Sequence, residues 1–230
     1  MTLYQYAKGY RYTSDTMFLY HFARSFRPKG SVLDVGCGCG ILGLLLKRDF
    51  PSTTLSMIDI QEEHTSLAEK NAAENRLGAD VIRGDFMAYD FGEKFDFVVS
   101  NPPFYHENTK KSEDKSLIIS RYATSLPLDR FLAKSFDILK PKGSLIFCYD
   151  AKQIEDIFVL SAKNRLKVCD ICFVYPRADK ECSLLLVMVK KESNSFVKIH
   201  SPLFVFDGES YSKGTKEIFL MADTRSVDWA

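Results

Sequence analysis

Short apolar runs alternate with amphipathic stretches through the middle of the chain. The apolar runs are β-branched or leucine-rich and predict strands over residues 31–36, 54–60, 80–83, 94–100 and 144–149. The stretches between and after them carry apolar residues at helical spacing, and they predict helices over 41–50, 62–77, 128–139 and 151–164. This alternation is typical of a parallel sheet with crossover helices.

The end of the pattern differs from the middle. Two apolar runs, 168–175 and 183–191, are separated by a charged turn and no helix, which predicts an antiparallel hairpin. Two short β-like pieces follow within 196–206, and a terminal helix is expected over 211–221. We expect the helix over 128–139 to stop at Pro141 and Gly143, before the next strand.

Composition fits one ordinary globular domain. The chain has 230 residues, of which 46% are hydrophobic and 27% charged. We expect a single domain over 1–230, with 1–30 as an N-terminal cap segment and 192–230 as a C-terminal extension. The formal net charge of +1 argues neither for nor against a nucleic-acid partner, so a basic footprint would have to be local.

Targeting and metal signals are weak. No apolar run is long enough to cross a bilayer, and the first residues lack the apolar core of a signal peptide. The six cysteines stand mostly in apolar runs, which indicates free thiols, a cytoplasmic location and no metal. Cys169, Cys172 and Cys182 lack a nearby fourth zinc ligand, and strand alternation places the first two on opposite faces.

A glycine-rich loop joins the first predicted strand to the first predicted helix, in the segment VLDVGCGCG. Gly36, Gly38 and Gly40 allow a tight turn and a close approach to a ligand. The following helix N-terminus favours an anionic group such as a carboxylate or a phosphate. The spacing is G-x-G-x-G and not the dinucleotide G-x-G-x-x-G, which favours a nucleoside with an amino-acid tail over a pyrophosphate.

Two acidic residues follow the next two strands. Asp59 ends the second strand, where a carboxylate can accept hydrogen bonds from both hydroxyls of a ribose. Asp85, in the segment RGDF, follows the third strand and suits an adenine edge. The alternative is that both residues merely cap a helix or a turn.

The segment NPPF, residues 101–104, ends the fourth strand because two prolines cannot continue a ladder. The side-chain oxygen of Asn101 and the carbonyl of Pro102 can accept the two N–H bonds of an exocyclic amino group. Pro103 stiffens the turn, and Phe104 can stack on a planar target. This arrangement would shift the amino nitrogen toward a nucleophilic geometry. The alternative is a Pro-Pro loop that only ends a strand.

The segments VLDVGCGCG, MIDI, GDF and NPPF, in this order and spacing, resemble the class I S-adenosylmethionine-dependent methyltransferases over about residues 31–191. The resemblance implies an α/β, Rossmann-like, seven-stranded and mostly parallel sheet with helices on both faces and an antiparallel last strand. It implies that S-adenosylmethionine is the cofactor, with its methionine end at Gly36, Gly38 and Gly40, its ribose at Asp59 and its adenine at Asp85. Asp34 would support the loop or the methionine amino group, and Asn101 would lie against both cofactor and target.

The NPPF segment also resembles the (N/D)PP(Y/F/W) signature of enzymes that methylate amino groups of adenine, cytosine, guanine or glutamine. Together with GYRYTSDTMFLYHFA, SRYATSLPLDRFL and the tail, it resembles the bacterial tRNA(Val) adenine N6-methyltransferase family. That resemblance implies tRNA as the partner and an adenine near the anticodon as the target. It also places residues 12–15 over the cofactor pocket.

Position after the NPPF loop makes Arg121 and Tyr122 candidates for RNA contact, with Lys110 and Lys111 as phosphate contacts. Lys8 and Arg11, and the stretch of Lys190, Lys191 and Lys198, are further basic candidates, although solvated charged edges would give the same pattern. Other functions stay open. They are glutamine methylation of a release factor, N-methylation of guanine or adenine in rRNA, DNA adenine methylation, and a non-catalytic cofactor-binding partner.

Overall fold

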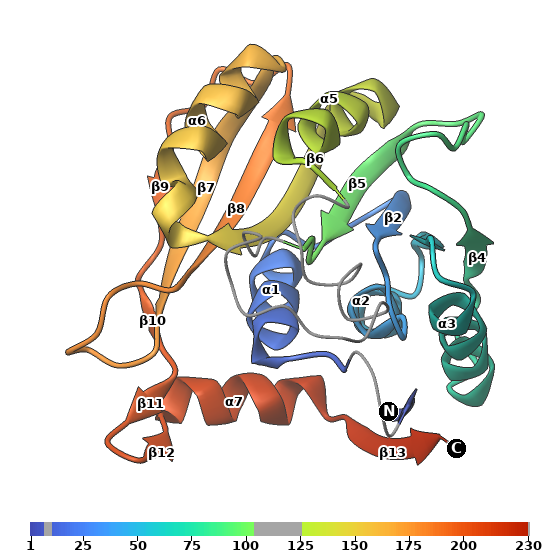
Figure 1. Ribbon diagram of the computed structural model, residues 1–230, viewed down its shortest axis with the longest axis horizontal. Helices are drawn as coiled ribbons and strands as arrows, with labels where there is room; N and C mark the ends of the chain where they lie inside the picture. The colour runs from blue at the N-terminus through green and yellow to red at the C-terminus, as the bar shows by residue number, and fades with distance from the viewer. Residues whose placement is uncertain (7–10, 104–125, 230) are drawn as a thin grey trace.

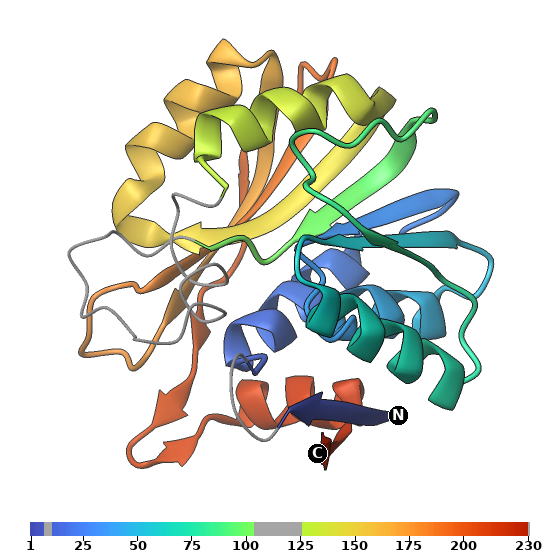
Figure 2. The same cartoon turned by 45° about the vertical axis from the view of Figure 1, so that its right-hand side comes forward.

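The computed structural model describes residues 1–6, 11–103 and 126–229. Its centre is a twisted sheet with helices on both faces (Figures 1 and 2). The strands run in the order β10-β7-β8-β6-β5-β2-β3-β4, and β9 also pairs with β7. They are β2 Ser31–Val35, β3 Thr54–Asp59, β4 Asp80–Arg83, β5 Phe95–Ser100, β6 Leu139–Asp150, β7 Leu166–Tyr175, β8 Leu184–Lys191, β9 Lys198–Ile199 and β10 Leu203–Phe204.

The long strands confirm the expected sheet. β2 pairs in parallel with β3 and β5, and β5 pairs in parallel with β6. β8 is antiparallel to both of its neighbours, β6 and β7, as the hairpin pattern predicts. The chain runs outward from β2 through β3 to β4 and then returns to β5 on the other side of β2. The crevice at the carboxyl ends of β2 and β5 is therefore a topological switch point, where ligands bind in such sheets.

Helices cover both faces of this sheet. α1, α2, α3 and α7 lie on one side, and α5 and α6 lie on the other (Figure 2). Each face carries its own cluster of buried apolar side chains, which explains why the central strands are apolar at consecutive positions. The helices are α1 Ser14–Ser25, α2 Ile41–Asp49, α3 Glu62–Glu74, α5 Leu128–Ile138, a 3₁₀ turn η2 Ala151–Gln153, α6 Ile154–Lys163 and α7 Lys213–Ala222.

Strand β6 begins earlier than expected. Its pairing with β5 jumps from Phe95 opposite Leu139 to Phe97 opposite Ser144, so the residues between form a bulge. Lys142 has φ +62° in this bulge, and a side chain on Gly143 would come within 2.9 Å of the Lys140 carbonyl oxygen. α5 ends at Ile138, one residue before the predicted end, but Pro141 and Gly143 do not stop it: they lie inside β6 and form its bulge.

Two terminal strands were not predicted. β1 Thr2–Tyr6 and β13 Arg225–Trp229 form a separate parallel pair, which brings the two ends of the chain together (Figure 1). The side chains of Asn71 and Asn75, on α3, exchange hydrogen bonds with the backbone of β1. Asn71 bonds Tyr4 at 2.7 and 3.0 Å, and Asn75 bonds Thr2 at 3.0 and 2.6 Å. A further small hairpin, β11 Phe206–Asp207 with β12 Ser210–Tyr211, precedes α7.

Helix α1 lies deeper than the expected cap segment. Phe18 and Tyr20 are at most 1% exposed, and the ring of Phe18 stacks on Phe219 of α7 at 6.3 Å. The Tyr20 hydroxyl donates to Asp49 at 2.5 Å, and burial together with this carboxylate raises the pKa of Tyr20 to about 12. Arg48 donates to the carbonyl of Ala222 at the end of α7. These contacts fasten the N- and C-terminal segments to α2.

The cysteines are free in the described ranges, but one expectation about them is wrong. Cys169 and Cys172 lie in the same buried cluster, because β7 has a register shift between Val168 and Asp170. Across residues 1–6, 11–103 and 126–229, no three His, Cys, Asp or Glu side chains lie close enough to share a metal ion. Within the same ranges, no helix has the length and apolarity needed to span a bilayer.

We predict that Asn71→Ala lowers the free energy of unfolding by about 2 to 4 kcal/mol, because it leaves buried backbone groups of β1 and the Cys39 carbonyl without partners. Asn75→Ala is the matched control, since Asn75 makes the same type of bond at a more exposed position. It should cost about 1 kcal/mol. Urea unfolding measures both, and equal losses would contradict the assigned role of Asn71.

Candidate active site

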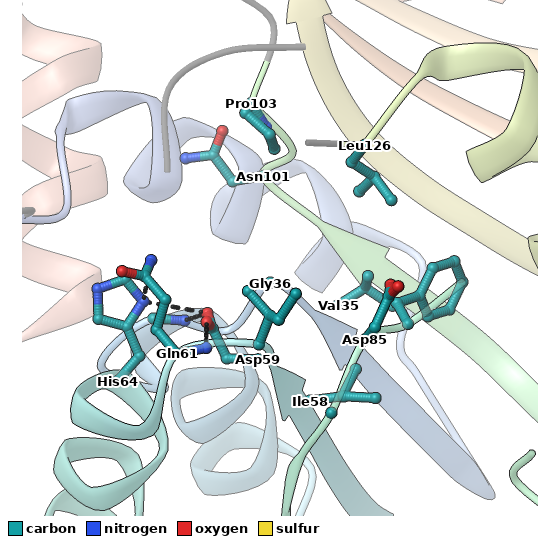
Figure 3. Close-up of a pocket in the computed structure, with 14 residues that line it drawn as sticks. Val35, Gly36, Ile58, Asp59, Gln61, His64, Asp85, Asn101, Pro103 and Leu126 are labelled. Carbon is teal, nitrogen blue, oxygen red and sulfur yellow. Dashed lines mark hydrogen bonds and ion pairs between the residues drawn. The ribbon is translucent and has the colours of Figure 1, made fainter. Parts of the chain in front are cut away.

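A cavity of about 270 Å³ opens at the carboxyl ends of β2, β3 and β5. Asn101 and Pro103 lie across it from Asp59, Gln61 and His64 (Figure 3). Six predicted site residues line it: Gly36, Gly38, Asp59, Asp85, Asn101 and Pro103. Segments separated by more than sixty residues therefore meet here, as expected for the carboxyl edge of a parallel sheet.

The glycine loop is held against β3. The backbone N–H groups of Gly36 and Cys37 donate to the Ile58 carbonyl at 2.9 and 3.1 Å. Gly36 has φ +66°, and a side-chain carbon there would meet no atom within 4 Å. The loop thus keeps its first glycine open toward the cavity, where a Cβ would take space from a ligand.

Gly40 has a different place from the one expected. It does not line the 270 Å³ cavity, and it stands at the N-cap of α2 with φ +81°. A Cβ there would lie 3.2 Å from the side chains of both Ala68 and Met57. Gly40 permits the turn into α2 and the close packing of α2 on α3, and contact with the cofactor is not needed to explain it.

Asp59 links the glycine loop to α3. Its Oδ2 accepts from the Gly38 N–H at 2.9 Å, and its Oδ1 accepts from the Gln61 N–H at 2.9 Å. The His64 Nδ1 lies 3.2 Å from the same Oδ2. The carboxylate is 7% exposed and stands on the cavity wall, so its remaining acceptor positions are fixed in place for a ligand hydroxyl. No motif in the sequence indicated Gln61 or His64 as site residues.

Asp85 both caps a turn and lines the cavity. Its Oδ1 accepts from the Met87 N–H at 2.9 Å, which agrees with the capping alternative, and its side chain is on the cavity wall. The rest of this end is apolar and was missed: Ile58, Ile60, Phe86 and Leu126. Ile60 is 53% exposed, which is unusual for a large apolar side chain and suits a flat ligand face. Its place directly after Asp59 was the available signal.

Asp34 lies behind the loop and does not line this cavity. It is 1% exposed, and its Oδ2 accepts from the Gly43 N–H of α2 at 2.8 Å. Burial, and secondarily the charge of Asp59, raise the pKa of Asp34 to about 7. These contacts match loop support, and Asp34 also lines a smaller, adjoining cavity, so the second implied role, toward the methionine amino group, stays a prediction.

Asn101 follows β5 directly and is held by two other elements. Its Nδ2 donates to the Thr16 Oγ1 of α1 at 2.9 Å, and its Oδ1 accepts from the Cys148 thiol of β6 at 3.0 Å. Pro102 is buried and Pro103 lines the cavity. A second, smaller cavity adjoins the first, because Gly36 and Asn101 line both. Its other lining residues are Tyr12, Thr16, Asp34, Cys37, Cys39, Ile41 and Leu42.

Several predicted contacts lie outside the described residues: Phe104, Lys110, Lys111, Arg121 and Tyr122, together with Lys8. Two basic candidates are engaged elsewhere. Arg11 pairs with Asp228 at 2.6 Å. Lys191 is 7% exposed, and its Nζ donates to the carbonyls of Phe136 and Leu139 at 2.8 and 3.1 Å. Lys191 closes the end of α5 and is not a phosphate contact.

Comparison with known protein families shows the family of this chain. The sequence matches the methyltransferase small domain family over residues 13–163. The chain belongs to this family. It is an S-adenosylmethionine-dependent methyltransferase domain, and its mostly parallel sheet with the antiparallel strand β8 is the fold that the motifs predicted.

Curated relatives of this methyltransferase fall into two groups. The tRNA1(Val) (adenine(37)-N6)-methyltransferase of Porphyromonas gingivalis is 27% identical over 60% of this chain and 58% of its own length. The protein of the same name from Vibrio campbellii is 22% identical over 84% of this chain and 82% of its own length. The ribosomal RNA small subunit methyltransferase C of Actinobacillus succinogenes is 42% identical over 63% of this chain, but only 42% of its own length is matched.

Solved structures share the fold of the methyltransferase. An Agrobacterium tumefaciens protein described as a predicted O-methyltransferase has a TM-score of 0.68 and 16% identity, with 94% of this chain and 100% of that chain covered. A T. thermophilus 16S rRNA N2 methyltransferase, in complex with AdoMet and guanosine, has a TM-score of 0.56 and 17% identity. It is covered over 44% of its length, and this chain over 79%.

We predict that two glycine substitutions differ in what they impair, cofactor binding for Gly36→Ala and stability for Gly40→Ala. Gly36→Ala should cost about 1 kcal/mol of stability, from its positive φ, but should weaken cofactor binding at least about tenfold because its Cβ enters the cavity. Gly40→Ala should cost about 2 to 4 kcal/mol, because strain and crowding add. Urea unfolding and titration calorimetry with S-adenosylmethionine separate the two. Normal cofactor affinity in Gly36→Ala would contradict the assignment.

We predict a pH effect for Asp34→Asn. Since the pKa of Asp34 is raised to about 7 in the fold, the folded state binds more protons than the unfolded state between pH ~4 and 7. The contribution of Asp34 to the free energy of unfolding therefore falls as the pH rises from ~4 to 7. The stability of Asp34→Asn relative to wild type should grow by up to about 2.7 kcal/mol from pH 5 to pH 7 in urea unfolding. A constant difference would contradict the raised pKa.

Proposed function

We propose that this methyltransferase transfers the methyl group of S-adenosylmethionine to the exocyclic amino nitrogen of an adenine in tRNA, near the anticodon. The observation that carries the proposal is Asn101 on the wall of the cavity, at the end of β5, with two prolines directly after it. The amide is already oriented by two hydrogen bonds. The cytoplasmic location stays a prediction.

The cavity residues fit the cofactor. Asp59 offers fixed carboxylate oxygens for ribose hydroxyls, and the apolar side chains of Ile58, Ile60 and Phe86 suit a purine face. Gly36 leaves open space at the junction of the two cavities. We assign the ribose to Asp59, the adenine to the end near Asp85 and the methionine portion to the glycine loop and the smaller cavity.

The bound cofactor supplies an electrophilic methyl group on a sulfonium. The protein has to prepare the nitrogen, whose lone pair is delocalised into the purine ring. The Asn101 Oδ1 and the Pro102 carbonyl oxygen each accept a hydrogen bond from one N–H group of the target. These two hydrogen bonds favour a pyramidal nitrogen and stabilise the positive charge that develops on it. The cofactor, when bound, would supply the methyl group with loss of its carbon–sulfur bond and would be left as a neutral thioether, and the proton released from the amino nitrogen would pass to solvent water.

The extent of this chain that is matched supports tRNA over rRNA as the substrate. The tRNA relative from V. campbellii is matched over 84% of this chain. The rRNA relative from A. succinogenes has higher identity, 42%, but is matched over 63% of this chain. That higher identity makes rRNA the second candidate, and the experiment below separates the two.

We predict that Asn101→Ala lowers methyl transfer at least about a hundredfold while the affinity for S-adenosylmethionine changes less than about threefold, because the lost oxygen acts on the developing charge. The assay mixes purified protein, methyl-labelled cofactor and total bacterial tRNA, followed by nucleoside analysis for N6-methyladenosine. Asn194→Ala, at an exposed position outside the cavity, is the control.

Each outcome bears on one part of the proposal. Label in N6-methyladenosine of tRNA supports it. Label in ribosomal subunits or in a release factor, with none in tRNA, keeps the chemistry and overturns the substrate. Cofactor binding without transfer to any of these acceptors overturns the catalytic assignment and favours a binding partner of another enzyme.

A further inference from the structure

The side-chain amide of Asn101 is hydrogen-bonded at its nitrogen and at its oxygen by residues from distant parts of the chain. Thr16 comes from the first turn of α1, and Cys148 comes from the C-terminal part of β6. The Asn101 Nδ2 lies 2.9 Å from the Thr16 Oγ1, and the Asn101 Oδ1 lies 3.0 Å from the Cys148 Sγ. Asn101 itself reaches the walls of both cavities.

The two partners of Asn101, Thr16 and Cys148, are buried. Thr16 is 3% exposed and Cys148 is 0% exposed. Burial, and then the charge of Asp15, raise the pKa of the Cys148 thiol well above its ordinary value, so the group stays protonated and donates. A thiol sulfur is a poor acceptor, so the oxygen of the amide belongs beside Cys148 and the nitrogen beside Thr16.

The orientation matters because the two ends of an amide have nearly the same shape and opposite hydrogen bonding. The terminal torsion of asparagine is broad and roughly two-fold, so rotamer preference alone does not select one end. A rotated amide would present N–H groups to the N–H groups of the target. The partners of Asn101 therefore decide whether it attracts or repels the amino group.

We propose that Thr16 and Cys148 are positioning residues, which hold the Asn101 amide in the orientation that leaves its oxygen able to accept from the target amino group. The inference rests on the proposed function and deepens it. It also gives α1 a role in the reaction, because the stacking of Phe18 on Phe219 and the bond from Tyr20 to Asp49 keep the helix that carries Thr16 in place.

Matched substitutions test Thr16. Thr16→Val keeps the side-chain shape and removes the acceptor, whereas Thr16→Ser keeps the hydroxyl. We expect Thr16→Val to lower kcat about five- to tenfold, with the KM for tRNA and the cofactor Kd within about twofold of wild type, and Thr16→Ser to restore kcat. Thr53→Val is the control for a buried threonine, since the Thr53 hydroxyl donates to the Phe50 carbonyl in a turn outside both cavities.

Cys148 is tested in the same way. Cys148→Ala should lower kcat by a similar factor and Cys148→Ser should retain it. The effects of Thr16→Val and Cys148→Ala should combine to less than their product, because both act through one amide. A raised cofactor Kd with unchanged kcat in Thr16→Val would assign Thr16 to cofactor binding and overturn the inference.

A spectroscopic readout separates failure of the inference from failure of the proposed function. The side-chain ¹H–¹⁵N signals of Asn101 are assigned by their loss in Asn101→Asp. Thr16→Val should shift both signals and speed their exchange with water, and Thr16→Ser should leave them near their wild-type positions. Unchanged signals in Thr16→Val overturn the positioning role. Absence of RNA methylation by the wild-type protein overturns the function, and the spectra still decide the positioning.

Discussion

The pairing of β2 with β5 is the constraint on which the site depends. Val35 and Ser100 stand opposite each other at the ends of these strands, and the buried Ser100 hydroxyl donates to the Val35 carbonyl at 2.8 Å. The glycine loop and Asn101 leave the sheet directly after this pair. One register position thus sets the spacing between the cofactor loop and the amide, and a slip of one residue would turn every neighbouring side chain to the other face.

The terminal segments add a further layer to this centre. Residues 2–6 and 225–229 pair with each other, and α7 packs against α1, which places Thr16 beside Asn101. The charge network of Arg24, Arg48, Asp49 and Tyr20 ties this layer to α2. Its carboxylate is satisfied by three donors, which is why a partly buried charge is tolerated there.

Much of the fold was predictable, because the strands of the main sheet have a simple sequence pattern. Strands buried on both faces appear as apolar runs, and the glycine loop, Asp59 and NPPF mark their carboxyl ends in order. The errors arose where local and tertiary signals conflict. Pro141 and Gly143 look like a stop but form a bulge, and the register shift in β7 moves Cys169 to the face expected for its neighbour. Gly40 has the right spacing for ligand contact but packs against Ala68.

The rest could not be deduced from the sequence, since it depends on distant pairs with no local pattern. Nothing around Thr16 or Cys148 indicates that both reach Asn101. Likewise, RSVDW reads as a polar tail until a partner strand is known. Ile60 is the exception, since the sequence shows an apolar residue directly after a strand-end carboxylate, and the structure adds that it is exposed.

The two asparagines of α3 show how a helix can satisfy the edge of a strand. Residues four apart on a helix are separated by about 6 Å along its axis, and residues two apart on a strand by about 6.6–6.8 Å. Asn71 and Asn75 have the first spacing, and Tyr4 and Thr2 have the second, so the two repeats nearly coincide over one step. The side-chain amides then stand in for the peptide groups of a missing neighbour strand. The match drifts by more than half an ångström per step, which limits such a helix-made edge to about two rungs, the length that the protein uses.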